Sequence, residues 1–405
     1  MNGKLSNILG VLIFSLLCVS CEKPSEQTQE TYYTEGLEYQ YSEEQNGYFV
    51  SNGTNTDDIV NVAPYYNNLP VIGVSSMGFY YSSIKEINLP DSIVQINYSA
   101  FGSCKELEKF NFPKSLEIIQ HNAFAGCSSL KEIIIPEGVK KIYEGAFSDI
   151  PNLEKISFPN SLEYLGDLYE SFHNPWYYSL SNYDDGGYYL GNDENPYLIL
   201  GSVGTQSEEL VVNENCKIFT MSEMLGQQNS GNLNFTLKKI ILSDSIEYFR
   251  TSGNLINLKE VVGDCKIKAI GEEAFDNCTR LESIPSLDYC EYIGIKAFRS
   301  TNIPFGSLKL PSIKVIDLEA FEETEGIKEI VFGKKLTSIG TNAFANSKDL
   351  ETVYIPKSVK NIGYAPFYMC NNLKTIFYEG TKEDWELINF GTPIKNVEIV
   401  YNTTY

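Results

Sequence analysis

Apolar and polar positions along this chain repeat with a period of 23 residues, in two separate blocks. The clearest marker is a phenylalanine that follows an alanine in every repeat except one, where Pro366 precedes it. These phenylalanines are Phe101, Phe124 and Phe147 in the first block, and Phe275, Phe298, Phe321, Phe344 and Phe367 in the second. A fixed period between about 20 and 50 residues is typical of a solenoid, in which each unit stacks only on its neighbours.

Residues 130–150 show the pattern within one unit. Ile133 and Ile135 belong to a first short strand, which Pro136 and Gly138 end with a turn. Val139 and Ile142 belong to a second short strand, and the pair Ala146-Phe147 follows it. The unit contains no amphipathic helical stretch of about 11 residues or more. We therefore predict a β-rich solenoid of about eleven 23-residue coils with parallel strand stacking and an irregular insertion in the middle.

Two charged residues follow the leading apolar position of each early unit, and their signs alternate from unit to unit. The pairs are Lys85-Glu86, Glu108-Lys109, Lys131-Glu132 and Glu154-Lys155. In a parallel sheet these side chains lie above one another, so opposite charges are expected to meet between adjacent coils. Exposed pairs contribute only about 0–1 kcal/mol each, so we expect them to set register more than stability.

The motif IPxxVxxI followed by AFxxCxxL resembles the BspA-type leucine-rich repeat, a bacterial variant of 23 residues. The resemblance is closest at residues 124–130 (FAGCSSL) and 275–281 (FDNCTRL), and residues 376–385 (IFYEGTKEDW) resemble the closing segment of that family. It implies a right-handed leucine-rich-repeat solenoid on a cell-surface or secreted protein used in adhesion or recognition. The family has no shared catalytic residues to transfer to this chain.

The pattern divides the chain into seven segments. They are a lipoprotein signal peptide (1–20), a flexible tether (21–35), a strand-rich N-terminal cap (36–74), a first repeat block (75–166), an irregular aromatic insertion (167–235), a second repeat block (236–378) and a C-terminal cap (379–405). Within the N-terminal cap, residues 38–41 and 47–50 are expected to form strands. A solenoid needs the open edge of its first coil covered, which is the role we assign to this cap.

The leader ends in LLCVSC at residues 16–21, which resembles a bacterial lipobox with Cys21 as the lipidated residue. Several acyl chains on one cysteine hold a protein stably at a membrane. The alternative is an ordinary cleaved signal peptide, since the apolar core is too short for a membrane span. We therefore expect a lipoprotein of the outer membrane, exposed at the cell surface.

The net charge of −22 excludes nucleic acid as a partner, because nucleic-acid binding requires a basic face. The chain has only two histidines, His121 and His173, and contains no nucleophile-elbow, paired-histidine or phosphate-loop motif. We therefore predict no enzyme activity, no cofactor and no metal. Residues 192–195 (NDEN) carry side-chain oxygens that could bind calcium, which is a minor alternative because the sequence has no EF-hand pattern.

Four of the nine cysteines are explained by the repeat, and two others, Cys18 and Cys21, lie in the leader. Four cysteines lie three residues after a repeat phenylalanine or its equivalent: Cys104, Cys127, Cys278 and Cys370. Because another repeat has the aliphatic Ile150 at this same position, we expect these cysteines to be small buried core residues. The spacing leaves the disulfide state of the remaining three open: Cys216, Cys265 and Cys290.

Two groups of residues are candidates for binding. The first is aromatic and lies in the insertion, comprising Trp176, Tyr177, Tyr178, Tyr188 and Tyr189. It suits recognition of a protein or glycan, although these rings could instead pack an irregular coil. The second is an apolar column at the exposed middle position of the leading strand, comprising Val331, Tyr354 and Phe377.

Three functions are consistent with the sequence. The first is a non-enzymatic surface lipoprotein for adhesion or protein recognition. The second is a glycan-binding component of a surface uptake system, which the aromatic insertion would permit. The third is a passive surface scaffold, which a uniformly polar face would favour. The expected partners are therefore an extracellular protein or glycan, together with the membrane through Cys21.

Overall fold

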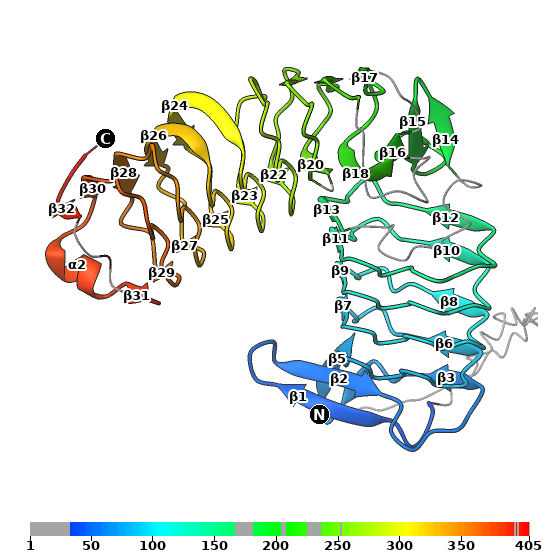
Figure 1. Ribbon diagram of the computed structural model, residues 1–405. Coiled ribbons are helices and arrows are strands. Elements are labelled where there is room, and N and C mark those ends of the chain that lie inside the picture. Colours follow the sequence, from blue (N-terminus) through cyan, green and yellow to red (C-terminus); the bar gives the residue numbers. More distant parts are fainter. Residues whose placement is uncertain are drawn as a thin grey trace, which may run out of the picture. The chain divides into compact units, whose positions relative to one another are not determined.

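The structure is a computed structural model that describes residues 33–166, 181–203, 208–224, 236–251, 253–392, 394 and 397–404. The chain divides into two compact units, residues 1–32 and residues 33–405, of which the second contains all of the described residues. Within it the chain winds into a β-solenoid of about fourteen turns, as predicted in kind, with parallel strands stacked from turn to turn (Figure 1).

The first strand of each turn belongs to what we call the leading ladder, which consists of the parallel sheets β3–β6–β8, β10–β12, β17–β19–β21 and β24–β26–β28–β30–β32. Its strands are β3 (Ile59–Asn61), β6 (Glu86–Asn88), β8 (Lys109–Asn111), β10 (Glu132–Ile134), β12 (Lys155–Ser157), β17 (Glu209–Val211), β19 (Lys239–Ile241), β21 (Glu260–Val262), β24 (Asn302–Leu310), β26 (Glu325–Phe332), β28 (Thr352–Ile355), β30 (Thr375–Tyr378) and β32 (Glu398–Val400).

The second strand of each turn belongs to the trailing ladder, and Figure 1 shows the two ladders at opposite edges of the turns in the first block. Its strands are β5 (Leu69–Val74), β7 (Gln95–Ile96), β9 (Ile118–Ile119), β11 (Lys141–Ile142), β13 (Tyr164–Leu165), β16 (Ile199–Val203), β18 (Ile218–Met224), β20 (Tyr248–Thr251), β22 (Ala269–Ile270), β23 (Tyr292–Ile293), β25 (Val315–Ile316), β27 (Ser338–Ile339), β29 (Asn361–Ile362) and β31 (Asn389–Phe390).

The predicted number of eleven coils is too low because β5, β16 and β18 also join the trailing ladder. These strands lie in the segments interpreted from sequence as a cap and an irregular insertion. Their inward residues, such as Val74 and Phe219, are fully buried like those of the regular repeats. The connections between them differ in length from those of the regular turns, so the 23-residue spacing that marks the repeats is lost.

Antiparallel strands precede each block. β1 (Glu38–Ser42) and β2 (Gly47–Ser51) match the two strands expected near the N-terminus, and they form a hairpin whose second strand pairs in parallel with β5. β4 (Tyr65–Tyr66) pairs antiparallel with β5. β14 (Asn182–Asp184) and β15 (Gly187–Leu190) form a second hairpin that pairs antiparallel with β16. The described helix is α2 (Lys382–Glu386), which Thr381 caps at its N-terminus.

The repeat phenylalanines form continuous aromatic stacks along the core. In the second block the rings of Phe275, Phe298, Phe321 and Phe344 lie parallel, with centroid distances of 5.0, 5.0 and 5.2 Å between neighbours. Phe219 and Phe249 extend this stack toward the N-terminus, although neither keeps the 23-residue spacing. Each ring is therefore covered by the rings of the turns before and after it, which explains why a single coil is not stable alone.

The Ala-Phe segment of each turn forms a loop that is hydrogen-bonded to the next one. In the loop around Phe321, the residues two before and two after the ring have left-handed φ values, 55° at Glu319 and 56° at Glu323. The N–H groups of Glu319, Phe321 and Glu323 donate to the carbonyl oxygens of Thr341, Ala343 and Ala345 in the following turn. We call this recurring set of three hydrogen bonds the loop ladder.

Candidate functional site

The predicted apolar column lies on the face of the leading ladder near its C-terminal end. In β26, β28, β30 and β32, Val331 pairs with Tyr354, Tyr354 with Phe377, and Phe377 with Val400. The rings of Tyr354 and Phe377 stack with a centroid distance of 4.8 Å and an interplanar angle of 16°. All four residues are half-buried, so the column is an apolar strip on the sheet surface rather than part of the core.

Polar residues border this strip on the same sheet. Lys309 of β24 faces Val331, and Thr352 of β28 pairs with Glu329 and Thr375 on either side. Ser307 Oγ donates a 2.8 Å hydrogen bond to Glu329 Oε1. An apolar centre with a polar border is the usual composition of a protein interface.

The alternating charges form ion pairs between adjacent turns, as predicted. Lys109 Nζ lies 3.0 Å from Glu86 Oε1, and Lys155 Nζ lies 3.4 Å from Glu132 Oε1. Lys131 Nζ lies 3.5 Å from Glu154 Oε1, so both charged positions pair between the third and fourth of these turns. Apart from half-buried Glu86, these side chains are exposed, and they fix the register of the leading ladder rather than forming a concentrated charged site.

A second column of ion pairs along the trailing ladder was missed in the sequence. Glu247 lies between Lys217 (3.4 Å) and Lys268 (2.8 Å), and Lys140 pairs with Glu117 at 3.1 Å. Burial works against ionisation of Glu247, but its contacts with Lys268 and Lys217 outweigh burial and lower the pKa of its carboxyl. The signal was present, because Glu117 and Lys140 are 23 residues apart.

The aromatic candidates of the insertion fall into three groups. Trp176, Tyr177 and Tyr178 lie outside the described residues, as does Cys21. Tyr188 is half-buried on β15, and its ring contacts that of exposed Tyr183 edge-on at 5.0 Å. Because successive side chains of a strand point to opposite faces, the next ring, Tyr189, points into the core.

That neighbouring ring, Tyr189, lies in the core with no exposed surface, and its hydroxyl accepts a 3.1 Å hydrogen bond from the N–H of Asn213. Burial raises the pKa of Tyr189 above its usual range. Its ring therefore packs the turn, which is the alternative left open for these aromatics in the sequence.

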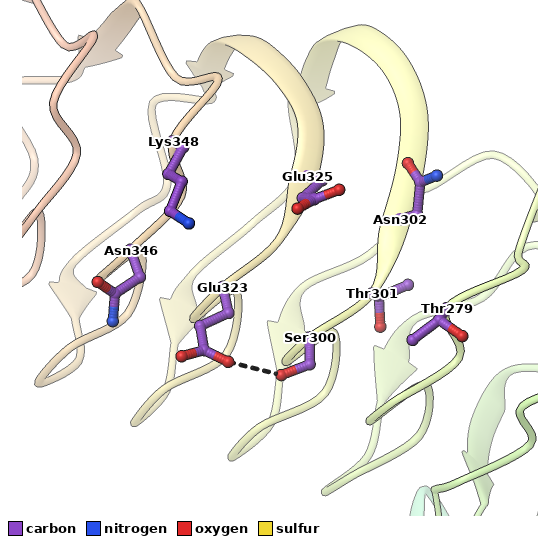
Figure 2. Close-up of a pocket in the computed structure, with 8 residues that line it drawn as sticks. All are labelled: Thr279, Ser300, Thr301, Asn302, Glu323, Glu325, Asn346 and Lys348. Atoms are coloured by element: carbon purple, nitrogen blue, oxygen red, sulfur yellow. Dashed lines mark hydrogen bonds between the residues drawn. The ribbon is translucent and has the colours of Figure 1, made fainter.

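A polar hollow of about 400 Å³ lies beside the Ala-Phe loops of the second block (Figure 2). It is lined by Thr279, Ser300, Thr301, Asn302, Glu323, Glu325, Asn346 and Lys348. Ser300 Oγ is already bonded to Glu323 at 3.0 Å, and the buried Thr301 hydroxyl donates to the carbonyl of Phe275. The hollow is lined by acidic, basic and neutral hydrogen-bonding groups, but the hydroxyls of Ser300 and Thr301 already bond to neighbouring turns.

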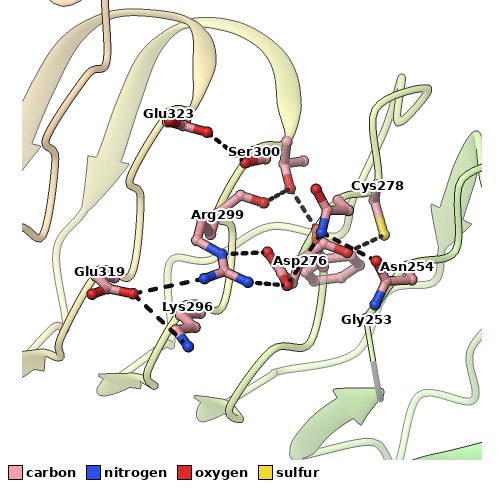
Figure 3. Close-up of polar contacts among 12 residues, drawn as sticks. Gly253, Asn254, Asp276, Cys278, Lys296, Arg299, Ser300, Glu319 and Glu323 are labelled. Carbon is pink, nitrogen blue, oxygen red and sulfur yellow. Dashed lines mark hydrogen bonds and ion pairs between the residues drawn. The ribbon is translucent and has the colours of Figure 1, made fainter.

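An ion-pair cluster lies on the same turns as this hollow (Figure 3). Arg299 Nε and Nη2 bind both carboxylate oxygens of Asp276, at 2.8 and 2.7 Å, and the Asp276 side chain is only 4% exposed. Glu319 lies near Arg299 and Lys296, at 3.8 and 4.0 Å. The hydrogen bond to Asp276 is the main reason that the pKa of Arg299 is raised. Its charges are neutralised within the cluster, which suits a structural clamp between turns.

The described residues contain no arrangement typical of catalysis. No group of three or more His, Cys, Asp and Glu side chains in this part of the chain is placed to hold a metal ion. His121 Nε2 lies 2.7 Å from Glu144 Oε2, and Glu144 also accepts a hydrogen bond from Tyr164 at 2.6 Å, so this histidine is paired with a carboxylate and not with a nucleophile.

The seven described cysteines are free and buried. Burial raises the pKa of Cys216, Cys278 and Cys290 to about 12, so their thiols stay protonated at neutral pH. Buried, protonated thiols are poor nucleophiles. Cys216 and Cys290, whose disulfide state the spacing left open, are not bridged, and neither is Cys265.

No helix in the described part of the chain is long and apolar enough to span a membrane. Comparison with curated proteins finds no match. Among solved structures, the chain resembles a leucine rich cell surface protein from Faecalibacterium prausnitzii A2-165, with 19% identity, a TM-score of 0.31, and coverage of 90% of this chain and 98% of that one.

Two further solved structures are similar. The leucine-rich repeat protein of Bacteroides ovatus ATCC 8483 shares 19% identity, with a TM-score of 0.29 and coverage of 91% of this chain and 99% of that one. The T. pallidum leucine rich repeat protein shares 17% identity, with a TM-score of 0.35 and coverage of 67% and 88%.

The family model for the BspA type leucine rich repeat region matches residues 72–175, 228–306, 248–374 and 291–403, which together span more than half of the chain. These matches include the Ala-Phe loops and most strands of both ladders, but not β3, β16, β17, β18 or Phe219. The chain therefore belongs to the BspA-type leucine-rich repeat family.

Proposed function

We propose that this protein is a non-enzymatic surface lipoprotein that recognises a protein partner, and that the strip of Val331, Tyr354, Phe377 and Val400 is its contact surface. The observation that carries the proposal is the in-register apolar column on the leading ladder that contains the stacked rings of Tyr354 and Phe377. The same position is aliphatic in β17, β19 and β21, at Val211, Ile241 and Val262, but carries no aromatic ring there. Four half-buried apolar side chains from four successive turns line one continuous strip, whereas the equivalent position in the first block is occupied by Asn88, Asn111 and Ser157 in three of four turns.

The stacked pair of Tyr354 and Phe377 is well suited to anchor such a contact. Aromatic residues dominate the binding free energy of protein interfaces because they bury a large area with few rotatable bonds. Since the two rings already stack at 4.8 Å in the free protein, little side-chain entropy is lost when a partner covers them.

The test is a binding screen of the purified protein against an array of extracellular matrix proteins, followed by the double variant Tyr354→Ser and Phe377→Ser. We expect the variant to keep its fold and to lose binding to any protein recognised by the unaltered chain. The matched control is Tyr289→Ser, which removes another exposed ring, on a turn outside the strip. Full binding by the double variant would contradict a role for the strip.

Anchoring at Cys21 is a separate part of the proposal, and it rests on the sequence of the leader. Cys21→Ala should abolish incorporation of labelled fatty acid and release the protein from the membrane fraction. Sensitivity of the anchored protein to protease added to whole cells would locate it at the cell surface. Continued membrane association of the Cys21→Ala variant would favour another mode of attachment.

Glycan binding is the second candidate, favoured by the edge-on pair of Tyr183 and Tyr188 on the β14–β15 hairpin. Tyr183 is 58% exposed, so its ring is available for stacking on a sugar. Under this alternative, Tyr183→Ser should abolish binding on a glycan array, while the strip variant should leave it unchanged. If the unaltered protein bound nothing on either array, the result would favour a passive scaffold.

A further inference from the structure

The last turn of the solenoid has both of its strands but a shortened connection between them. Residues 363–374 join β29 to β30 in the preceding turn and contain an Ala-Pro-Phe loop. In the last turn only residues 391–397 join β31 to β32, five residues fewer. This connection contains no small-aromatic pair, so the phenylalanine stack ends one turn before the two strand ladders do.

The loop ladder is consequently left open at its end. In the preceding loop, the N–H groups of Asn342, Phe344 and Asn346 donate to the carbonyl oxygens of the residues around Phe367. In the loop of Phe367 itself, the hydroxyl of Thr392 accepts the first of the three hydrogen bonds, from the N–H of Ala365, at 2.7 Å. The N–H groups of Phe367 and Met369 have no acceptor among the described residues.

A hollow of about 810 Å³ lies at this open edge. Its lining includes Pro366, Phe367, Cys370 and Leu373 on one side and Thr392, Ile394 and Val397 on the other. None of the described residues that line it carries a charge. The hollow thus occupies the place that the loop of a complete last turn would fill.

The residues at the rim of this hollow differ from those in the interior loops. Tyr368 is 61% exposed and Met369 is 51% exposed, directly after the last phenylalanine of the stack. The matching pair in the preceding loop is Ala345 and Asn346. In the two loops before that, both positions are polar or charged. Large apolar side chains exposed beside an uncharged hollow are typical of an interaction site.

We propose that this hollow binds a segment of another protein that supplies the missing loop, namely an uncharged turn with a small residue followed by an aromatic one. The carbonyl of the small residue accepts from the N–H of Phe367, and the carbonyl after the aromatic residue accepts from the N–H of Met369. The aromatic ring stacks on Phe367, while Tyr368 and Met369 cover it from the rim.

The interface that this segment would form is the one that already joins each turn to the next. Along the second block it consists of the loop-ladder hydrogen bonds and of phenylalanine rings 5.0–5.6 Å apart. Docking of this kind combines main-chain hydrogen bonds, which give affinity, with a side-chain pocket, which gives specificity.

A second copy of this chain fits the site less well. At the N-terminal end of the first stack, the loop of Phe79 would have to offer its carbonyl groups to the open edge of another molecule. The carbonyl of Gly78, which corresponds to the small residue, already accepts a 2.8 Å hydrogen bond from the N–H of Asn52 in the same chain. That end of the loop ladder is therefore covered, whereas the end at Phe367 is open as far as the described residues are concerned.

The first test measures amide hydrogen exchange in the purified protein. We expect the N–H groups of Phe367 and Met369 to exchange much faster than those of Phe344 and Asn346, which are bonded in the loop ladder. Equal protection at both pairs of amides in the free protein would overturn the proposal, because the edge would then already be occupied.

The second test uses a synthetic peptide with the sequence of residues 339–350 of this chain (IGTNAFANSKDL), which contains one interior Ala-Phe loop. We expect it to bind and to slow exchange at Phe367 and Met369. A control peptide with alanine in place of the phenylalanine should bind more weakly by about tenfold or more, since the aromatic ring is the anchor.

The matching protein variant combines Tyr368→Ala with Met369→Asn, which installs the residues of the preceding loop and so should preserve folding. It should also weaken peptide binding by about tenfold or more, while Tyr289→Ala should not. Unchanged binding by the double variant would overturn the proposal. Dimerisation of the free protein that this variant abolishes would assign the site to a second copy and refute the assignment to another protein.

Discussion

Thr324 Oγ1 donates a hydrogen bond of 2.8 Å to the carbonyl oxygen of Phe298, one turn earlier in the stack. The residue three positions after the phenylalanine makes the same contact in several other turns, through a hydroxyl or a thiol. These are Cys104 to Phe79, Cys127 to Phe101, Thr301 to Phe275, Ser347 to Phe321 and Cys370 to Phe344. Cysteine, serine and threonine can replace one another at this position because each side chain is small and can donate a hydrogen bond.

We expect Thr324→Val to destabilise the protein by roughly 1–3 kcal/mol, because the buried carbonyl of Phe298 then lacks this hydrogen bond and its desolvation on folding is no longer compensated. Thr324→Ser should cost less, since the hydroxyl remains. Urea denaturation followed by circular dichroism measures both. Thr337→Val is the control, because its exposed hydroxyl bonds the carbonyl of Lys314 where water can replace it. Equal losses from the two valine substitutions would contradict a special role for the buried donor.

The clamp between Asp276 and Arg299 gives a second prediction. Arg299→Met leaves the buried Asp276 carboxylate without its partner and should cost roughly 2–4 kcal/mol, less than for a fully buried pair because water reaches one side of Arg299. Asp276→Asn in the same chain should recover part of this loss. A double-mutant cycle in urea measures the coupling, and additive effects of the two substitutions would show that the pair is not coupled.

Glu247 gives a prediction about pH. Its pKa lies below the ordinary value of 4.5, so ionised Glu247 stabilises the folded state above that pH, and the stabilisation is lost as the pH falls through the lowered pKa. Glu247→Gln should therefore reduce the free energy of unfolding at neutral pH, and the difference from the unaltered protein should shrink below about pH 4.5.

The control for this experiment is Glu214→Gln, which alters an exposed carboxylate that forms no ion pair with the described residues. Its unfolding curve should follow that of the unaltered protein at every pH. A difference for Glu247→Gln that stayed constant down to low pH would show that lost packing, and not lost charge, is responsible.

The cysteines of the solenoid should be inert in the folded protein. Burial raises the pKa of Cys104 and Cys370 to about 12, and all seven described cysteines are buried, although Cys370 also lines the hollow at the end of the solenoid. Iodoacetamide at neutral pH should therefore modify none of them before unfolding and all of them in denaturant. Mass spectrometry of peptides identifies the sites, and rapid labelling of Cys127 in the native state would contradict its burial.

Within the regular repeats, much of the fold could be predicted from the sequence. The spacing of Phe275, Phe298 and Phe321 determines the stack, because a residue that returns at a constant interval returns to the same place in every turn. The alternation of Glu132 and Lys155 likewise indicated which charges meet, since in-register parallel strands bring equivalent positions together. The strip of Val331, Tyr354 and Phe377 was predicted on the same ground.

Prediction failed where the spacing changes. β16 and β18 join the trailing ladder, but connections of other lengths separate Phe219 from the regular phenylalanines, and a period cannot be recognised from one or two irregular intervals. The direction of Tyr189 was also undetermined, because a run of tyrosines gives no alternation of apolar and polar residues to show which ring faces the core.

The sequence by itself determined the repeat, the parallel stacking and the membership of each side chain in a column, since all of these follow from periodicity along one chain. Only the tertiary structure decided how the columns end. The N–H groups of Phe367 and Met369 find no acceptor in the described part of the following turn. The thiol and hydroxyl donors to the preceding carbonyls and the clamp of Asp276 by Arg299 are contacts between turns. Such contacts depend on the path of the neighbouring turn, which residue spacing does not specify.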